Sequence, residues 1–153
     1  MASLVNCITE ISAGWSEYKK ARVVDKDHSV HRYVTRTLPL ALSETLSDDA
    51  DLKVQGSVGL GNVTAAPWIA TFDTRITKSA ASGYYVVYLF SVDMKFVYLC
   101  FGLGATQFAQ AFSRRRDRYE AMDAARERLL DVIARHLPDT LNQKMSPGDI
   151  DLG

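Results

Sequence analysis

The chain has no net charge, few cysteines and no long apolar run. Each of these three absences argues against one class of protein. Lysine and arginine together number 18, as do aspartate and glutamate, so a basic surface for nucleic acid has to be local. Two widely separated cysteines, Cys7 and Cys100, favour a reducing cytoplasm over a disulfide scaffold. The most apolar window, residues 84–90, is far shorter than the roughly 20 residues of a membrane-spanning helix. We therefore expect a cytoplasmic domain with no membrane partner.

Recognisable catalytic motifs are also lacking. The glycines at positions 56–61 are not followed by the Gly-Lys-Ser/Thr of a phosphate-binding P-loop, and their spacing does not fit a dinucleotide fingerprint. The three histidines belong to no Cys/His cluster with metal-ligand spacing. Asp93 and Lys95 have the Asp-x-Lys spacing of some nuclease sites, but they fall in a predicted hairpin turn, where aspartate is a common turn former. We expect no catalytic residue, no metal and no cofactor, with a nuclease site at Asp93 and Lys95 as the minor alternative.

The spacing of apolar residues divides the chain into helical and extended segments. Helical spacing predicts helices over residues 2–22, 28–46 and 106–138. Pro39 lies inside the second of these, so we expect a break near it. Alternating or β-branched runs predict four strands, at residues 52–55, 68–72, 83–90 and 95–101.

The order of these segments predicts the fold class. Helices precede strands and a helix follows them, without βαβ alternation, which indicates an α+β fold with a mainly antiparallel sheet. The last two strands are expected to form a central aromatic hairpin. The length fits a single domain, 1–153. Its expected parts are a helical part, a sheet with binding loops, one long helix and a tail, at residues 1–50, 51–105, 106–138 and 139–153.

The aromatic strand over residues 83–90 is apolar on both of its faces. Alternation puts Tyr85, Val87 and Leu89 on one face and the even-numbered residues 84–90 on the other. Either the sheet is covered on both sides, or one face lines a pocket with aromatic walls. Periodicity alone favours the first interpretation.

The most concentrated basic run comprises Arg114, Arg115, Arg116 and Arg118. Residues 112–137 contain seven arginines and five acidic residues, a local net charge of +2. Such runs are usually solvated helix faces with ion pairs between residues four apart. Contact with phosphate groups is the functional alternative.

A glycine-spaced loop between the first two predicted strands is the strongest candidate for a binding site. Three glycines fall within residues 56–61, which marks backbone that needs positive φ or close approach by another group. Asn62 and Thr64 add hydrogen-bonding side chains, and Trp68 adds a large flat apolar surface at the start of the next strand.

Residues 59–70 (GLGNVTAAPWIA) carry a resemblance to a known family. This segment resembles the G-x-G-N-hydrophobic-T/A-x-x-P-W loop of the McrB N-terminal domain family, which is found in modification-dependent (type IV) restriction systems. Three other segments are similar to motifs of that family, at residues 72–77 (FDTRIT), 83–90 (GYYVVYLF) and 150–153 (IDLG). The resemblance spans residues 50–105, and the flanking helices match in order and length only.

The resemblance implies a DNA-binding specificity domain that recognises 5-methyl- or 5-hydroxymethylcytosine in double-stranded DNA by base flipping. Such a domain targets a type IV restriction effector, a nuclease or motor domain or subunit, to foreign DNA. A base inside a duplex cannot be inspected on its 5-position and its Watson–Crick edge together, so the reader extrudes it. Extrusion costs a few kcal/mol, and stacking on aromatic side chains returns about 1–3 kcal/mol per base.

The resemblance also assigns roles to residues. The DNA-binding loop is Gly59, Leu60, Gly61, Asn62 and Thr64. The flipped-base pocket is lined by Trp68, Tyr85 and Leu89. A second DNA-facing loop contains Gly102, Gly104 and Thr106. Leu60 stands where the family has a tyrosine that wedges into the duplex, and a leucine is also an apolar wedge. A further pocket tyrosine of the family comes from a more C-terminal segment and has no aligned counterpart here. That wall of the pocket is either missing, supplied by Tyr119, or outside this sequence.

A second hypothesis comes from a different class of protein. The neutral net charge and the leucine at position 60 are also compatible with a protein-interaction or sensor module of a phage-defence system. Such a module would have kept the fold without the base pocket. A large exposed apolar patch would favour this alternative.

Overall fold

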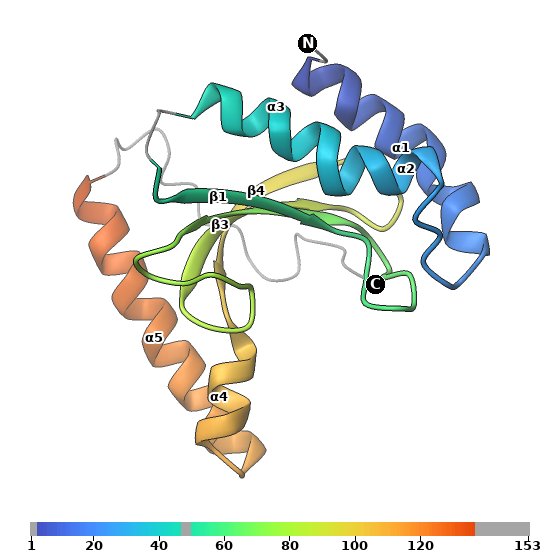
Figure 1. Ribbon diagram of the computed structural model, residues 1–153. Coiled ribbons are helices and arrows are strands. Elements are labelled where there is room, and N and C mark those ends of the chain that lie inside the picture. Colours follow the sequence, from blue (N-terminus) through green and yellow to red (C-terminus); the bar gives the residue numbers. More distant parts are fainter. Residues whose placement is uncertain (1–2, 47–49, 137–153) are drawn as a thin grey trace.

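The computed structural model describes residues 3–46 and 50–136, which form a four-stranded antiparallel sheet with helices on both sides. The strands pair in chain order and are β1 (Leu52–Ser57), β2 (Trp68–Asp73), β3 (Tyr84–Phe90) and β4 (Val97–Leu103). The N-terminal helices lie over one face, and the two C-terminal helices project from the opposite side (Figure 1). The predicted α+β class with a central aromatic hairpin is therefore confirmed. Within the described residues, no helix has the length and apolar character needed to cross a bilayer.

Helix α1 (Leu4–Lys20) presents one apolar stripe to the sheet. It begins after Ser3, whose side-chain oxygen accepts a hydrogen bond from the Asn6 N–H at 3.1 Å and so caps the first turn. The buried residues of the helix recur at intervals of three or four and are Cys7, Ile11, Trp15 and Tyr18. Both cysteines are free thiols.

The second predicted helix follows as three helical segments in direct succession, α2 (Ser29–Arg32), η1 (Tyr33–Thr37) and α3 (Leu38–Thr45). The segment η1 is a π-helical turn, in which the Leu38 N–H donates to the Tyr33 carbonyl oxygen five residues earlier. Pro39 lies in the first turn of α3 and has no N–H to donate to the preceding turn. The break expected near Pro39 is thus a widened turn in a continuous helical path, a common device for absorbing a lost helical hydrogen bond.

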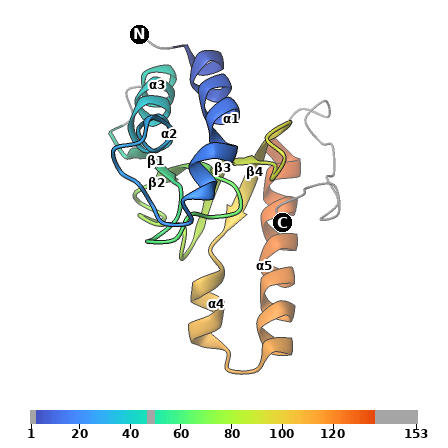
Figure 2. The same cartoon turned by 90° about the vertical axis from the view of Figure 1, so that its right-hand side faces the viewer.

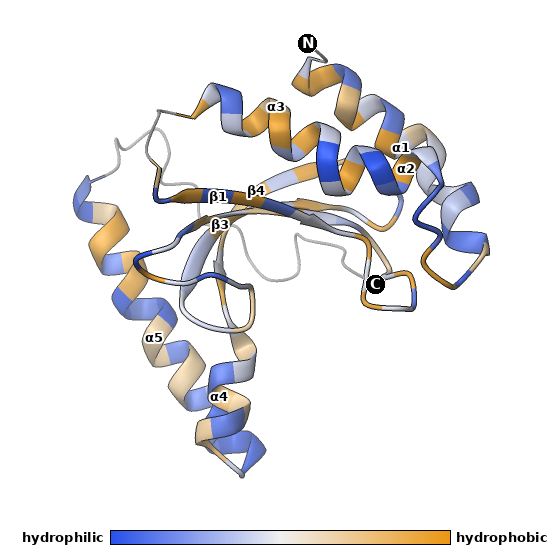
Figure 3. Ribbon diagram, in the orientation of Figure 1, coloured by the Kyte–Doolittle hydropathy of each residue, from blue (hydrophilic) through white to orange (hydrophobic). Residues whose placement is uncertain are grey.

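The main core lies between these helices and the face of the sheet that they cover. Ile69 and Phe90 from the strands are completely buried in it, together with Trp15 and Val34 from the helices. Gly56 allows the close approach, because a Cβ on this residue would overlap the Val34 carbonyl group of η1. Apolar residues (orange) are frequent on α1 and α3 in Figure 3, as expected for helices that cover a core.

A second, smaller apolar cluster lies on the opposite face of the sheet. Its buried members are Ala70, Phe72 and Val87, and larger half-buried side chains surround them. The loop between β2 and β3 lies on this side of the sheet and contributes Ala80 to the cluster (Figure 1). The sheet is therefore apolar on both faces, as the alternation in residues 83–90 predicts.

The predicted long C-terminal helix is confirmed, but it begins later than residue 106. The structure has two helices, α4 (Ala105–Ala111) and α5 (Arg115–His136), which pack against each other as an antiparallel hairpin (Figure 2). Phe112 adopts extended backbone angles, with φ −126° and ψ 116°, and ends α4. Neither helix contains a buried residue, which agrees with the many hydrophilic residues (blue) on α5 in Figure 3. The tail expected at residues 139–153 lies outside the described residues.

Candidate nucleic-acid interface

The loop between β1 and β2 presents Leu60 to solvent at its tip. Leu60 has a relative exposure of 102 %, which is full exposure of the residue to solvent. The residues on either side have positive φ, +121° at Gly59 and +92° at Gly61, which only glycine adopts without strain. A Cβ on Gly59 would also overlap the Asn62 carbonyl group. The two glycines therefore create a tight turn with a single apolar side chain projecting from it.

Backbone hydrogen bonds hold this loop against the segment that links α1 to α2. The Val24 N–H donates to the Gly61 carbonyl oxygen, and the Val63 N–H donates to the Arg22 carbonyl oxygen, each at 2.8 Å. These bonds form an isolated antiparallel bridge between Val23 and Asn62. Leu60 is consequently displayed on a braced turn, since the backbone on its C-terminal side is paired with a separate segment.

The polar residues of the loop differ in how their side chains are used. The Thr64 hydroxyl donates to the Ala66 carbonyl oxygen at 2.7 Å and so stabilises the loop itself. The Asn62 side chain is exposed to solvent. The Trp15 Nε1–H and the Lys19 ammonium group both donate to the Ala65 carbonyl oxygen at 3.2 Å, which fixes the loop to α1. Of these two polar residues, Asn62 is therefore the one that is more open to solvent.

Trp68, Tyr85 and Leu89 lie on the same face of the sheet and belong to the second apolar cluster. Trp68 on β2 and Leu89 on β3 are direct cross-strand partners. Tyr85 lies four residues from Leu89, about 13 Å along the strand. Together with the buried Ala70 and Val87 between them, these residues form what we call the aromatic strip. All three predicted pocket residues are half-buried and share this surface.

Tyr85 is held firmly at the far end of the aromatic strip. Its ring lies 5.2 Å from the ring of Phe72, and its hydroxyl donates to the Ala80 carbonyl oxygen at 3.3 Å. Burial raises the pKa of Tyr85, which favours the protonated hydroxyl that donates this hydrogen bond. A Cβ on its cross-strand partner Gly102 would overlap the Tyr85 ring. Gly102 thus provides the space that the ring occupies.

The second predicted loop lies at the other end of the sheet from Leu60. Gly104 is buried, and its N–H donates to the Gly83 carbonyl oxygen at 2.9 Å. A Cβ on Gly104 would overlap the backbone of Ser82. Thr106 is exposed in the first turn of α4. The structure therefore does not bring the two predicted loops together, because one full strand length separates them.

The arginine run lies where α4 turns into α5, at the end of the hairpin that projects from the sheet (Figures 1 and 2). Arg116 forms an ion pair with Glu120 at 2.7 Å, and the Arg115 guanidinium lies 5.4 Å from the centre of the Tyr119 ring. Arg118 donates to the Phe112 carbonyl oxygen at 3.4 Å. These contacts are those of a solvated helix face. Tyr119 is 51 % exposed and does not belong to the apolar cluster that contains the aromatic strip.

Comparison with protein families adds an independent finding. A family model described as the MrcB-like, N-terminal domain matches residues 10–150. The chain belongs to this family. Membership indicates a DNA-binding domain from restriction systems, and the family is not a catalytic one. Comparison with curated proteins and with solved structures finds no match.

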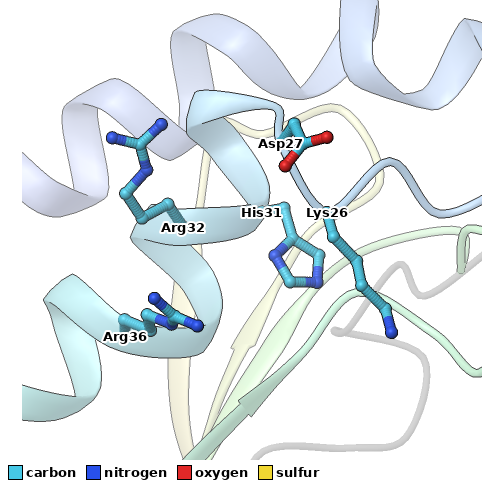
Figure 4. Close-up of a pocket in the computed structure, with 5 residues that line it drawn as sticks. All are labelled: Lys26, Asp27, His31, Arg32 and Arg36. Carbon is cyan, nitrogen blue, oxygen red and sulfur yellow. The ribbon is translucent and has the colours of Figure 1, made fainter.

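This MrcB-like domain has a second basic cluster that the sequence analysis missed. Lys26, His31, Arg32 and Arg36, with Asp27, line a surface pocket of about 420 Å³, which we call the basic pocket (Figure 4). Burial lowers the pKa of His31, and the charges of Lys26 and Arg36 lower it further. The signal in the sequence is the pair of arginines four residues apart, which a helix places on one face.

Asp93 and Lys95 form the turn that joins β3 to β4 in this MrcB-like domain. The Asp93 carboxylate accepts hydrogen bonds from the Ser91 hydroxyl at 2.7 Å and from the Lys95 N–H at 3.1 Å. These bonds, with the nearby Lys95 charge, hold the pKa of Asp93 below its usual range. The interpretation of Asp93 as a turn former is confirmed. Among residues 3–46 and 50–136, no three His, Cys, Asp or Glu side chains are grouped as metal ligands.

Proposed function

We propose that this domain recognises a modified cytosine in double-stranded DNA by flipping the base out of the helix. The observation that carries the proposal is the fully exposed Leu60 at the tip of a braced turn, with the aromatic strip beginning at Trp68. An apolar side chain inserted between base steps unstacks them and occupies the vacated space. Leu60 is the wedge in this proposal.

The extruded base stacks on the half-buried side chains of Trp68 and Leu89, which are paired across β2 and β3. Stacking on an aromatic ring returns about 1–3 kcal/mol per base, which offsets much of the few kcal/mol lost on extrusion. The surroundings of these two residues are apolar, since Ala70 is 0 % and Val87 is 4 % exposed. Such an environment suits the 5-methyl group of a modified cytosine better than it suits an ionised group.

The domain supplies recognition in this proposal, and cleavage comes from elsewhere. A nuclease or motor domain or subunit of a restriction system acts on the DNA that the domain has bound. The family is a DNA-binding one, which supports this division of labour. The modification read is 5-methylcytosine or 5-hydroxymethylcytosine.

The test combines binding with a direct report of flipping. Duplexes with cytosine, 5-methylcytosine or 5-hydroxymethylcytosine carry 2-aminopurine next to the target base, and its fluorescence rises when the stack is disrupted. We expect tighter binding and higher fluorescence with one of the modified duplexes. Equal affinity for all three duplexes, with no fluorescence change, would overturn the proposal.

Two substitutions distinguish the role of Leu60 from the role of the aromatic strip. Leu60→Ala is expected to abolish the fluorescence rise, and Trp68→Ala is expected to abolish the preference for the modified base. The matched control is Leu40→Ala, because Leu40 is also a strongly exposed leucine, at 64 %, but lies on α3. The control is expected to bind and flip as the parent does.

The alternative function, a protein-interaction module, is favoured by a different surface. Leu99 and Phe101 on β4 are 60 % and 51 % exposed, and both point to the helix-covered side of the sheet. Apolar patches of this kind mark contact surfaces for other proteins. If Leu99→Ser leaves DNA binding intact but abolishes association with the restriction partner, the domain has both surfaces. If no duplex binds and the chain self-associates through Leu99 instead, the alternative replaces the proposal.

A further inference from the structure

Basic residues are concentrated in one segment of this neutral chain. Residues 19–36 contain six lysines and arginines and two aspartates, a local net charge of +4. The arginine-rich segment 112–137 reaches only +2 with seven arginines, because five acidic residues are interleaved with them. The rest of the chain is therefore net acidic, and residues 19–36 carry the larger excess of positive charge of the two segments.

The cations of the basic pocket are available to a ligand. Lys26, Arg32 and Arg36 are exposed, and within the part of the chain that the structure describes none of them forms an ion pair. Arg32 and Arg36 lie on successive turns of one helical path, with His31 beside them and Lys26 on the preceding loop (Figure 4). Like charges four residues apart on a helix repel each other, so an anion between them relieves an unfavourable arrangement.

The basic pocket is linked rigidly to the loop that carries Leu60. Lys26 follows two residues after Val24, whose N–H is bonded to the Gly61 carbonyl oxygen. The same linking segment pairs through Val23 with Asn62. The segment enters α2 at His28, whose Nδ1 accepts a hydrogen bond from the Val30 N–H at 3.2 Å. An anion held in the pocket is thereby kept in a fixed position relative to the tip of the loop.

We propose that the basic pocket formed by Lys26, His31, Arg32 and Arg36 binds phosphate groups of the DNA backbone next to the base that the Leu60 loop extrudes. This inference rests on the proposed function, and it assigns the electrostatic anchor to α2 and η1, not to the arginine run of α5. Phosphate contacts supply most of the sequence-independent affinity of a DNA-binding protein and set its register on the duplex. Arginine is suited to this role because its planar guanidinium binds phosphate through two parallel hydrogen bonds.

The test measures affinity against salt concentration for two matched double variants. Arg32→Gln with Arg36→Gln removes two cations from the basic pocket, and Arg115→Gln with Arg116→Gln removes two from α5. The pocket variant is expected to weaken binding to modified and unmodified duplexes by the same factor, about tenfold or more, and to lower the slope of log K against log salt by about two. Arg32→Lys with Arg36→Lys keeps the charges and is expected to restore the slope. The α5 variant is expected to leave the slope unchanged.

The outcomes separate this inference from the proposed function. If the α5 variant lowers the slope and the pocket variant does not, the inference is wrong while base flipping stands. If the pocket variant lowers the slope but no duplex shows the 2-aminopurine signal, the pocket binds DNA and the proposed function fails. Tighter binding of polyglutamate than of duplex DNA at equal ionic strength would make the pocket a site for acidic protein segments, and would overturn the inference.

Discussion

Where β1 leads into β2, Gly61 has open space around its Cα, whereas Gly104, where β4 leads into α4, is buried against the backbone of Ser82. Gly61 has φ +92°, which a residue with a side chain rarely adopts. Gly104 has φ −65° and ψ 111°, angles that are ordinary for any residue. Glycine is required at position 61 by the backbone conformation and at position 104 by the lack of space for a side chain.

This difference separates two uses of glycine that look alike in the sequence. At the first end the glycines project a side chain into solvent, and at the second they let two segments touch. Only the first arrangement exposes a large apolar side chain fully to solvent, that of Leu60. The second end serves the packing of Tyr85 and of the loop between β2 and β3.

The largest expected effect is that of Gly104→Ala. The new methyl group would overlap the Ser82 backbone, which cannot rotate away as a side chain can. We expect the free energy of unfolding to fall by about 3 kcal/mol, the upper part of the range for overpacking a tight site. Urea denaturation followed by circular dichroism measures the change.

The control for this variant is Thr106→Ala, an exposed position in the next turn. Exposed substitutions of this type change stability by about 0.5 kcal/mol or less. If Gly104→Ala is stable but loses DNA binding, the second end contacts DNA after all, and the contrast between the two ends is wrong.

A smaller effect is expected for Gly61→Ala. Nothing lies within 4 Å of the added methyl group, so the cost comes only from the positive φ. That cost is about 1 kcal/mol, in line with the penalty for left-handed backbone in a residue with a Cβ. Gly61→Asn is the comparison, since asparagine tolerates positive φ better than alanine. Thermal unfolding should rank glycine first, asparagine second and alanine third, and a larger loss for asparagine would contradict the conformational explanation.

The fold could be predicted because its determinants are local and periodic. The stripe on α1 and the alternation along β3 each specify a face, and the aromatic hairpin follows from the short polar link between two β-branched runs. The split between α4 and α5 was missed because Phe112 and Ser113 are neither proline nor glycine. Extended backbone at Phe112 ends the helix there without a breaker residue.

The site was only partly predictable for a different reason. Trp68, Tyr85 and Leu89 share a face because strand parity fixes which way side chains point. The distance between the two predicted loops follows from the order and register of the strands. The sequence motifs of the loops carry no information about either. The basic pocket was missed because its residues come from a loop and from two successive helical turns, while the net charge of the whole chain hides their excess of positive charge.

The smallest effect is expected for the loss of a single carboxylate at either end of the sheet. Asp93 lies at the same end as Leu60, and Asp73 lies at the opposite end. The Ser91 hydroxyl chiefly lowers the pKa of Asp93, and hydrogen bonds from Arg75 chiefly lower that of Asp73. A lowered pKa in the folded state adds stability above the pKa of the unfolded chain, and this stability is lost as the pH falls through the folded value. The deficits of Asp93→Asn and Asp73→Asn should therefore be largest near neutral pH, begin to shrink near about pH 4, and disappear only below the lowered pKa of the folded state. Salt should shrink the Asp73→Asn deficit more, because the chief partner of Asp73 is an exposed cation, whereas the chief partner of Asp93 is a neutral hydroxyl. Deficits that do not change with pH in urea titrations would show that neither charge contributes to stability.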